Sequence, residues 1–151
     1  MRRTEYHLDS SGRWHRLMVK YLKWKLGRFS VATGISIPPG TCALGLTLYH
    51  HGSIVVNQAT RIGRNCCIMN NVNIGANNGS SKAPRIGDNV YIGPGAVVFG
   101  DIEIADGCYI GANSVVCRSV VEANAVVVGV PGHIVKHESE PWWQKNRLDR
   151  T

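Results

Sequence analysis

Small apolar residues recur at every sixth position through the middle of the chain. They are Leu44, Val56, Ile62, Ile68, Ile74, Ile86, Ile92, Val98, Ile104 and Ile110, and Val116 and Val128 continue the phase. A period of six matches neither the helical period of 3.6 nor the strand period of 2. A glycine or alanine follows most of these residues, so each repeat reads as a short strand and a tight turn. The pattern is typical of a hexapeptide β-helix, a solenoid in which every sixth side chain points into one core.

The repeat also predicts the extent and the corners of the solenoid. It begins near Ile35 and ends at about Val130. Three repeats make one three-sided coil of roughly eighteen residues, so we expect about five coils. Successive coils should stack as parallel strands about 4.8 Å apart. Glycine and asparagine suit the tight corners because they tolerate positive φ. The corner candidates are Asn65, Asn70, Asn71, Asn77, Gly95, Gly107 and Asn113.

Polar residues interrupt the grid at two places. Between Ile74 and Ile86 the expected apolar position is Ser80, and the segment 77–85 offers no core residue. We expect this segment to be a loop extruded from the solenoid; such loops often carry function on a rigid scaffold, although a tolerated insertion has the same composition. The other break is His50, which occupies an inward grid position. A hydrogen-bonded core histidine and a functional histidine both fit that position.

The first thirty residues predict a basic amphipathic helix. Residues 1–11 read as a polar lead-in, and Asp9, Ser10 or Ser11 caps a helix over about 12–28. One helical face carries Trp14, Leu17, Met18, Tyr21 and Leu22. This stripe either packs on the solenoid end or on a partner subunit, or it rests on anionic lipid as a peripheral membrane contact.

The C-terminal part predicts a cover for the last coil. The chain leaves the solenoid at Pro131. Residues 137–151, which include Trp142 and Trp143, should form a short helix or an extended segment over the last coil, because an open parallel edge needs a cover. The chain thus divides into a basic amphipathic helical segment (1–30), a β-helix domain (31–136) and a tail (137–151).

Charge and hydropathy narrow the classes of function. The net charge is +7, and residues 1–30 contribute +6 of it, while residues 31–130 carry five charges of each sign. A basic head on a neutral body argues against a nucleic-acid-binding fold, which presents a basic face. The longest apolar runs fall well short of the roughly 18 residues of a membrane span.

The cysteines and histidines predict reduced thiols and no metal site. The five cysteines are Cys42, Cys66, Cys67, Cys108 and Cys117. Their spacing matches no metal motif, so we expect small turn or core residues. An odd count without a recognisable leader predicts a cytoplasmic location. His50 and His51 are adjacent and cannot easily reach one tetrahedral ion together, and no third ligand is evident.

Several segments together resemble a known family. The hexapeptide repeat, the segment from Tyr49 to Asn57, the loop at 77–85 and the Gly129-Val130-Pro131 ending are similar to the serine acetyltransferase branch of the hexapeptide-repeat acyltransferases. The chain more closely resembles the short serine-acetyltransferase-like proteins of bacterial surface-polysaccharide loci. The resemblance covers roughly residues 30–137. It implies a mainly β protein built as a single-stranded left-handed parallel β-helix. It also implies a homotrimer with active sites at the subunit interfaces, and acetyl-CoA as donor in a groove between neighbouring solenoids.

The resemblance also implies roles for particular residues. His50 matches the catalytic histidine, which takes the proton from an acceptor hydroxyl as that oxygen attacks the thioester. The candidate acceptor-binding residues are Tyr49, His51 and Lys82; His51 either shares the base role or orients the acceptor. The implied coenzyme A contacts are Pro94, Ala112, Cys117, Arg118 and Lys136, among which Arg118 and Lys136 suit phosphate.

Three departures from the family pattern concern the acceptor. Tyr49 replaces an aspartate just before the catalytic histidine, Ser36 is the nearest match to its second aspartate partner, and Lys82-Ala83-Pro84 replaces an Arg-His pair before proline. The general base is therefore retained, while much of the serine-binding set is absent. We expect an O-acetyltransferase for a sugar or glycan precursor, with serine as the alternative acceptor. A hypothesis of another class is a non-catalytic trimeric scaffold that docks on a membrane or a synthase partner through residues 12–28.

Overall fold

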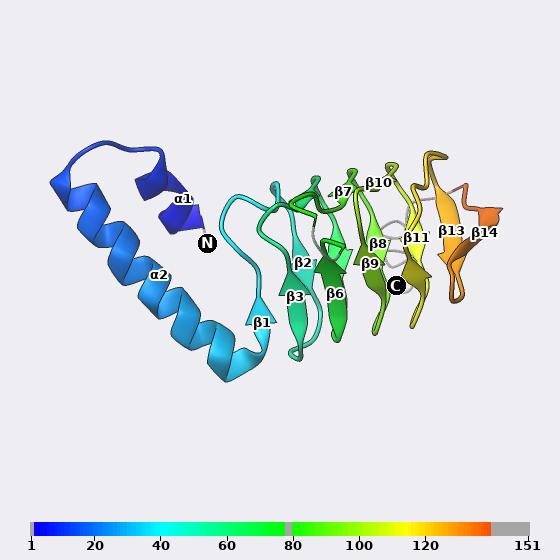
Figure 1. The fold of residues 1–151 in the computed structure, drawn as a ribbon, viewed down its shortest axis with the longest axis horizontal. Helices are drawn as coiled ribbons and strands as arrows, with labels where there is room; N and C mark the ends of the chain where they lie inside the picture. The colour runs from blue at the N-terminus through cyan, green and yellow to red at the C-terminus, as the bar shows by residue number, and fades with distance from the viewer. Residues whose placement is uncertain (1, 78–79, 140–151) are drawn as a thin grey trace, which may run out of the picture.

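The computed structural model describes residues 2–77 and 80–139, which form a helical hairpin followed by a β-helix (Figure 1). The helices are α1 (Arg2–Leu8) and α2 (Arg13–Thr33). The strands are β1 (Ile35–Ser36), β2 (Thr47–Leu48), β3 (Ile54–Val56), β4 (Arg61–Ile62), β5 (Cys67–Ile68), β6 (Val72–Gly75), β7 (Arg85–Ile86), β8 (Tyr91–Ile92), β9 (Val97–Phe99), β10 (Glu103–Ile104), β11 (Tyr109–Ile110), β12 (Val115–Val116), β13 (Ala125–Val128) and β14 (His133–His137). The predicted single-stranded parallel β-helix is confirmed.

The strands form the three faces of a prism. Sheet A has the order β1-β3-β6-β9-β12, sheet B has the order β4-β7-β10, and sheet C has the order β2-β5-β8-β11-β13-β14. All pairings are parallel except that of β13 with β14. Each strand therefore hydrogen-bonds to the strand of the next coil, as the six-residue period requires.

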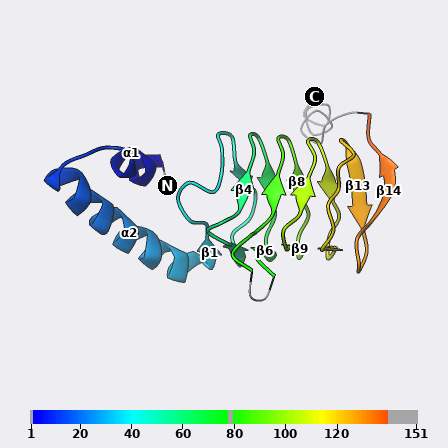
Figure 2. The same ribbon diagram turned by 45° about the horizontal axis from the view of Figure 1, so that its top comes forward.

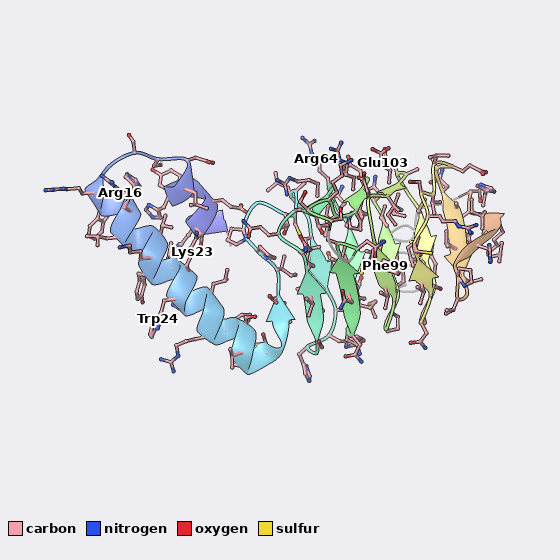
Figure 3. All side chains as sticks on the ribbon, viewed as in Figure 1. Arg16, Lys23, Trp24, Arg64, Phe99 and Glu103 are labelled. Carbon is pink, nitrogen blue, oxygen red and sulfur yellow. The ribbon has the colours of Figure 1, made fainter. Side chains whose placement is uncertain are left out.

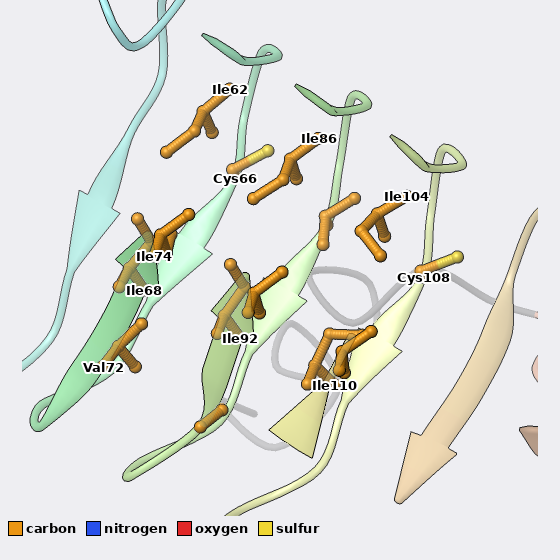
Figure 4. Close-up of a cluster of buried hydrophobic side chains, with 14 of the residues drawn as sticks. Ile62, Cys66, Ile68, Val72, Ile74, Ile86, Ile92, Ile104, Cys108 and Ile110 are labelled. Carbon is orange, nitrogen blue, oxygen red and sulfur yellow. The ribbon is translucent and has the colours of Figure 1, made fainter. Parts of the chain in front are cut away.

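Stacked apolar side chains fill the interior of the prism, and two of the columns hold isoleucine in three successive coils (Figure 4). In sheet C, Ile68, Ile92 and Ile110 lie in register and are fully buried. In sheet B, Ile62, Ile86 and Ile104 also lie in register and are buried. Burying one such side chain stabilises the fold by about 1.5–3 kcal/mol. The predicted grid is thus confirmed between Val56 and Val116.

At its start the grid fails, because the first coil is longer than predicted. Leu48 pairs with Ile68 and Val56 pairs with Ile74, so eight positions on one coil face six on the next. The two additional residues lie in the corner between β2 and β3 and shift the preceding chain by two positions. The predicted inward positions of Leu44 and His50 are therefore wrong: both are exposed.

Two other residues take the inward positions of that first coil. Cys42 is buried and bridges to Ile62 in sheet B, in place of Leu44. Leu48 packs against the core in sheet C, in place of His50. The last coil is shortened instead. Val127 pairs with Ile110 and is fully buried, so the predicted inward position of Val128 is also wrong.

The predicted loop is confirmed between β6 and β7, where it projects from the solenoid (Figure 2). Ile74 pairs with Val98 across twenty-four positions, whereas Ile86 pairs with Ile104 across the usual eighteen. One whole hexapeptide is therefore extruded, and the phase of the core is retained. The prediction that 77–85 lacks core residues is wrong at its end, since Ala83 and Pro84 are buried.

The close approach of successive coils explains the small residue that follows most of the inward isoleucines. A Cβ on Gly93 would lie 2.8 Å from the Ala112 nitrogen and 2.8 Å from the Ile110 oxygen. These are backbone atoms of the next coil, so they have little freedom to move. At the corners, positive φ is confirmed for the predicted Asn65, Asn71, Gly95, Gly107 and Asn113 and is not found at Asn70 or Asn77.

The N-terminal region contains two helices rather than the one predicted. Residues 1–11 include α1, and α2 continues to Thr33, five residues beyond the predicted end. Gly12 precedes α2 and makes no side-chain capping bond, so the predicted cap at Asp9, Ser10 or Ser11 is wrong. None of the helices in the described part of the chain has the length and hydropathy of a membrane span.

β14 covers the edge of the last coil. It folds back antiparallel on β13 after a cis Val130–Pro131 bond. The chain leaves the solenoid at the predicted proline, but the cover begins at His133 and not at residue 137. Trp142, Trp143 and the rest of 140–151 lie outside the described residues.

The cysteines give a test of the core in solution. All five are free, four are buried, and Cys117 is exposed. We expect one thiol to react with an aromatic disulfide reagent in the native protein, and the other four only after unfolding in guanidinium. More than one rapidly reacting thiol in the native protein would contradict this packing.

Burial of these thiols also predicts a loss of stability in alkali. It raises the pKa of Cys66 from 9.0 to about 11 and that of Cys67 to about 12. Above pH 9 the unfolded chain therefore releases protons that the native chain retains, so the free energy of unfolding falls as pH rises from 9 towards 11. A Tm series over this range, with Cys66→Ala as the comparison variant, should show a shallower fall for the variant.

Candidate active site

His50 and His51 lie in the lengthened corner between β2 and β3, and both are exposed. Within the described residues, neither imidazole has a hydrogen-bond or ionic partner. An exposed imidazole without a partner is open to an acceptor hydroxyl, which is the geometric requirement for a general base.

The residues at the family's orienting positions do not contact His50. Ser36, at the position of the family's second aspartate, pairs in register with Val55 on sheet A. Tyr49 precedes His50 and is 45% exposed. No carboxylate in the described residues contacts His50.

Five predicted site residues, Tyr49 and His51 among them, share one edge of the prism. This histidine edge consists of the corners between sheets C and A, at 49–53, 69–71, 93–96 and 111–114. Backbone bonds stack these corners: Gly95 donates to Asn70 at 3.0 Å, and Asn113 donates to Pro94 at 2.9 Å. His50 lies in the first coil, Pro94 in the third and Ala112 in the fourth, so they are spaced over about 15 Å along the edge.

Three others lie along a second edge. This loop edge consists of the corners between sheets A and B, at 75–84, 100–102 and 117–119. Lys82 extends from the loop, and its Nζ pairs with the Asp101 carboxylate at 2.6 Å. Cys117 and Arg118 are exposed at the last of these corners. Sheet A separates the two edges, so one protomer does not bring the predicted set together.

Lys136 lies apart from both edges. It is on β14, opposite Val126, and its Nζ pairs with Glu138 at 2.6 Å. Its side chain is 61% exposed, so this ion pair is solvent-screened and contributes little stability. The lysine therefore remains able to exchange Glu138 for a phosphate.

Sequence reasoning missed residues that neighbour the predicted site. Tyr91 and Tyr109 stack on the outer face of sheet C with centroids 4.4 Å apart and an interplanar angle of 8°. Burial, and then the neighbouring Tyr109, raise the pKa of Tyr91 to about 12. Their eighteen-residue spacing could have predicted this stack. Asp101, the partner of Lys82, carries no comparable signal.

Comparison with known proteins identifies the family. Residues 83–118 match the family model described as bacterial transferase hexapeptide (six repeats). The serine acetyltransferase of Staphylococcus xylosus is 44% identical over 110 residues, which are 70% of this chain and 50% of the relative. The chain is a hexapeptide-repeat protein, and over most of its length it is similar to serine acetyltransferases. The enzyme of that name from Staphylococcus epidermidis is 43% identical over 119 residues, or 76% of this chain and 54% of the relative. This hexapeptide-repeat chain thus spans about half the length of the curated relatives it matches.

Solved structures agree with this assignment and show the hand of the helix. Serine acetyltransferase from Neisseria gonorrhoeae superposes with a TM-score of 0.73 and 28% identity over 99% of this chain and 56% of that one. The Brucella abortus enzyme, solved with coenzyme A, gives 0.70 and 29% over 83% and 51%. The solenoid is accordingly the left-handed β-helix that the resemblance implied. Within the described residues, no three His, Cys, Asp or Glu side chains gather as a metal site.

Proposed function

We propose that this hexapeptide-repeat protein is an acetyl-CoA-dependent O-acetyltransferase in which His50 is the general base. The observation that carries the proposal is the exposed, unpartnered His50 at the head of the histidine edge, in line with Pro94 and Ala112. The serine acetyltransferase-like sequence supports coenzyme A as the carrier of the acetyl group, since a relative has been solved with it.

The reaction follows from the chemistry of an imidazole and a thioester. An unprotonated nitrogen of His50 accepts the acceptor's hydroxyl proton while the oxygen attacks the acetyl carbonyl carbon. The tetrahedral intermediate then collapses, the carbon–sulfur bond breaks, and the imidazolium returns its proton to the departing sulfur. A backbone N–H of a coil corner would stabilise the oxyanion.

A homotrimer completes the site in this proposal. The outer face of sheet A carries Val55, Val97 and Val115, and that of sheet C carries Tyr91 and Tyr109. Sheet B instead presents charged residues, namely Arg61, Arg85 and Glu103. Burying the apolar faces between three copies would leave sheet B in solvent. The histidine edge lies between these two faces, so residues of the neighbouring protomers would border it.

The acceptor we propose is a sugar or glycan precursor. An amino acid acceptor needs partners for both an ammonium and a carboxylate. Within the described residues, the His50 corner offers no carboxylate for the ammonium, and Lys82 lies on the other edge of sheet A. Serine is the second candidate, because the matched relatives are named serine acetyltransferases.

A thiol-release assay with acetyl-CoA separates these acceptors. We expect faster release of coenzyme A with sugars or nucleotide sugars than with serine or other amino acids. Faster release with serine would assign the second candidate. No release with any acceptor, together with no thermal shift at saturating coenzyme A, would leave the scaffold hypothesis. A ligand at 100 times its Kd should stabilise the protein by about 2.7 kcal/mol.

Two cations should affect the donor rather than the acceptor. Arg118→Ala and Lys136→Ala are each expected to raise KM for acetyl-CoA about three- to tenfold with kcat retained, because exposed charge pairs contribute about 1 kcal/mol. Arg61→Ala, on the outer face of sheet B, is the matched control and should change neither constant. A change in acceptor KM alone would show that the coenzyme A assignment is wrong.

A further inference from the structure

α2 has two apolar faces, although the sequence predicted one. The predicted stripe divides: Met18 and Leu22 lie half-buried on the inner side with Leu26. The outer side carries large apolar side chains that are 51–66% exposed: Trp14, Leu17, Tyr21 and Trp24. Their spacing of three and four residues places them in one row along the helix. Figure 3 shows Trp24 on the side of α2 turned away from the solenoid.

Contacts within the outer face hold its aromatic rings in place. The rings of Tyr21 and Trp24 stack with centroids 6.2 Å apart. The guanidinium of Arg28 lies 5.2 Å from the centroid of Trp24. The outer face of α2 is therefore a row of apolar side chains in which two aromatic rings stack, with a cation at its C-terminal end.

The lysines and arginines of α2 are not balanced by any acidic residue of the helix. Its sequence contains six lysines and arginines and no aspartate or glutamate. Residues 1–30 hold +6 of the net charge of +7, whereas residues 31–130 are neutral. Arg13, Lys20, Lys25 and Arg28 are exposed beside the apolar row. A partner for this face must be both apolar and anionic.

We propose that the outer face of α2 docks on an anionic bilayer surface. Tryptophan and tyrosine rings favour the headgroup region, where their apolar bodies and polar atoms are both satisfied. Flanking cations add about 1 kcal/mol each near anionic lipid. Nucleic acid would require cations at the centre of the contact, but here the centre is apolar. The helix lies in the interface and does not cross it.

Docking through this face sets the orientation of the solenoid. α2 lies at the end of the molecule next to the first coil (Figure 1), and that coil carries the His50 corner. The lipid surface would therefore lie at the His50 end and away from β14. In a homotrimer, three such helices would act together, so the apparent affinity would exceed that of one helix.

Vesicle flotation of the full chain tests the proposal. We expect flotation with vesicles of phosphatidylcholine and phosphatidylglycerol, weaker flotation at high salt, and none with phosphatidylcholine alone. The variant Leu17→Glu/Trp24→Glu should lose at least about tenfold in affinity. The control Arg61→Gln/Arg85→Gln lowers the net charge by the same two units on sheet B and should float like the wild type.

Three results would overturn the proposal. They are equal binding to neutral vesicles, equal binding by the Leu17→Glu/Trp24→Glu variant, and loss of binding in the sheet B control. Circular dichroism and Tm of each variant exclude misfolding, since all four substituted side chains are exposed. If the α2 variant instead dissociates an oligomer while the wild type binds no vesicle, a second copy of the chain covers this face.

Discussion

Replacing His50 by alanine is expected to lower kcat for acetyl transfer by about 10²–10⁴-fold, the usual contribution of a positioned general base. The substitution removes an exposed side chain without a partner in the described residues, so the fold and the oligomeric state should not change. Thiol release with saturating acetyl-CoA and acceptor gives kcat, and analytical ultracentrifugation reports the assembly.

His51→Ala is the matched control, because this neighbour lies in the same corner with similar exposure. Its predicted role is acceptor binding, so we expect mainly a higher KM for the acceptor and a loss of kcat within about tenfold. A large loss in His51→Ala with full activity in His50→Ala would transfer the base to His51. Full activity in both variants would refute the mechanism.

Replacing Gly93 by alanine is expected to destabilise the protein by about 1–3 kcal/mol, as overpacking does in other cores. The new Cβ would meet the Ala112 nitrogen and the Ile110 oxygen of the next coil at 2.8 Å. Neither atom can retreat without moving the ladder that joins the coils. Urea unfolding should show a lower midpoint with an unchanged m value.

Gly27→Ala provides the opposite case within the same chain. Gly27 lies in α2, and nothing lies within 4 Å of an added Cβ. Alanine favours the helix over glycine by about 1 kcal/mol, so this variant should be as stable as the wild type or more stable. If both substitutions shifted the midpoint alike, close coil stacking would not be the reason for glycine at position 93.

The middle of the solenoid was predictable because each repeat places its residues in the same environment. Ile92, for example, meets an isoleucine in the coil before it and another in the coil after it. The prediction failed where the coil length changes, as at Leu44 and Val128, because a fixed six-residue period cannot show where a coil gains or loses a residue. α1 was missed because a helix of seven residues has little intrinsic stability. Contacts distant in sequence hold it, among them the bond from the Gly40 nitrogen to the Glu5 carboxylate.

Only part of the candidate site could be predicted from the sequence. His50 drew attention by its place on the grid, whereas the structure puts it in an exposed corner. Its assignment as a base rests on the match to the family's catalytic histidine and on this exposure. The separation of Lys82, Cys117 and Arg118 from His50 follows from which corner each occupies. The corner that a residue occupies depends on the length of every coil before it and on the extruded hexapeptide. The sequence motifs alone predict neither of these.

β14 blocks end-to-end association of the solenoid at its C-terminal coil. A parallel solenoid whose last coil were open would offer its strand edge to the first coil of another molecule, and copies would join end to end into a fibre. Here the outer backbone groups of β13 are hydrogen-bonded to β14, an antiparallel strand of the same chain, so this strand edge is already paired. The faces of the prism, and not this strand edge, are therefore the surfaces left for contact with another copy of the chain.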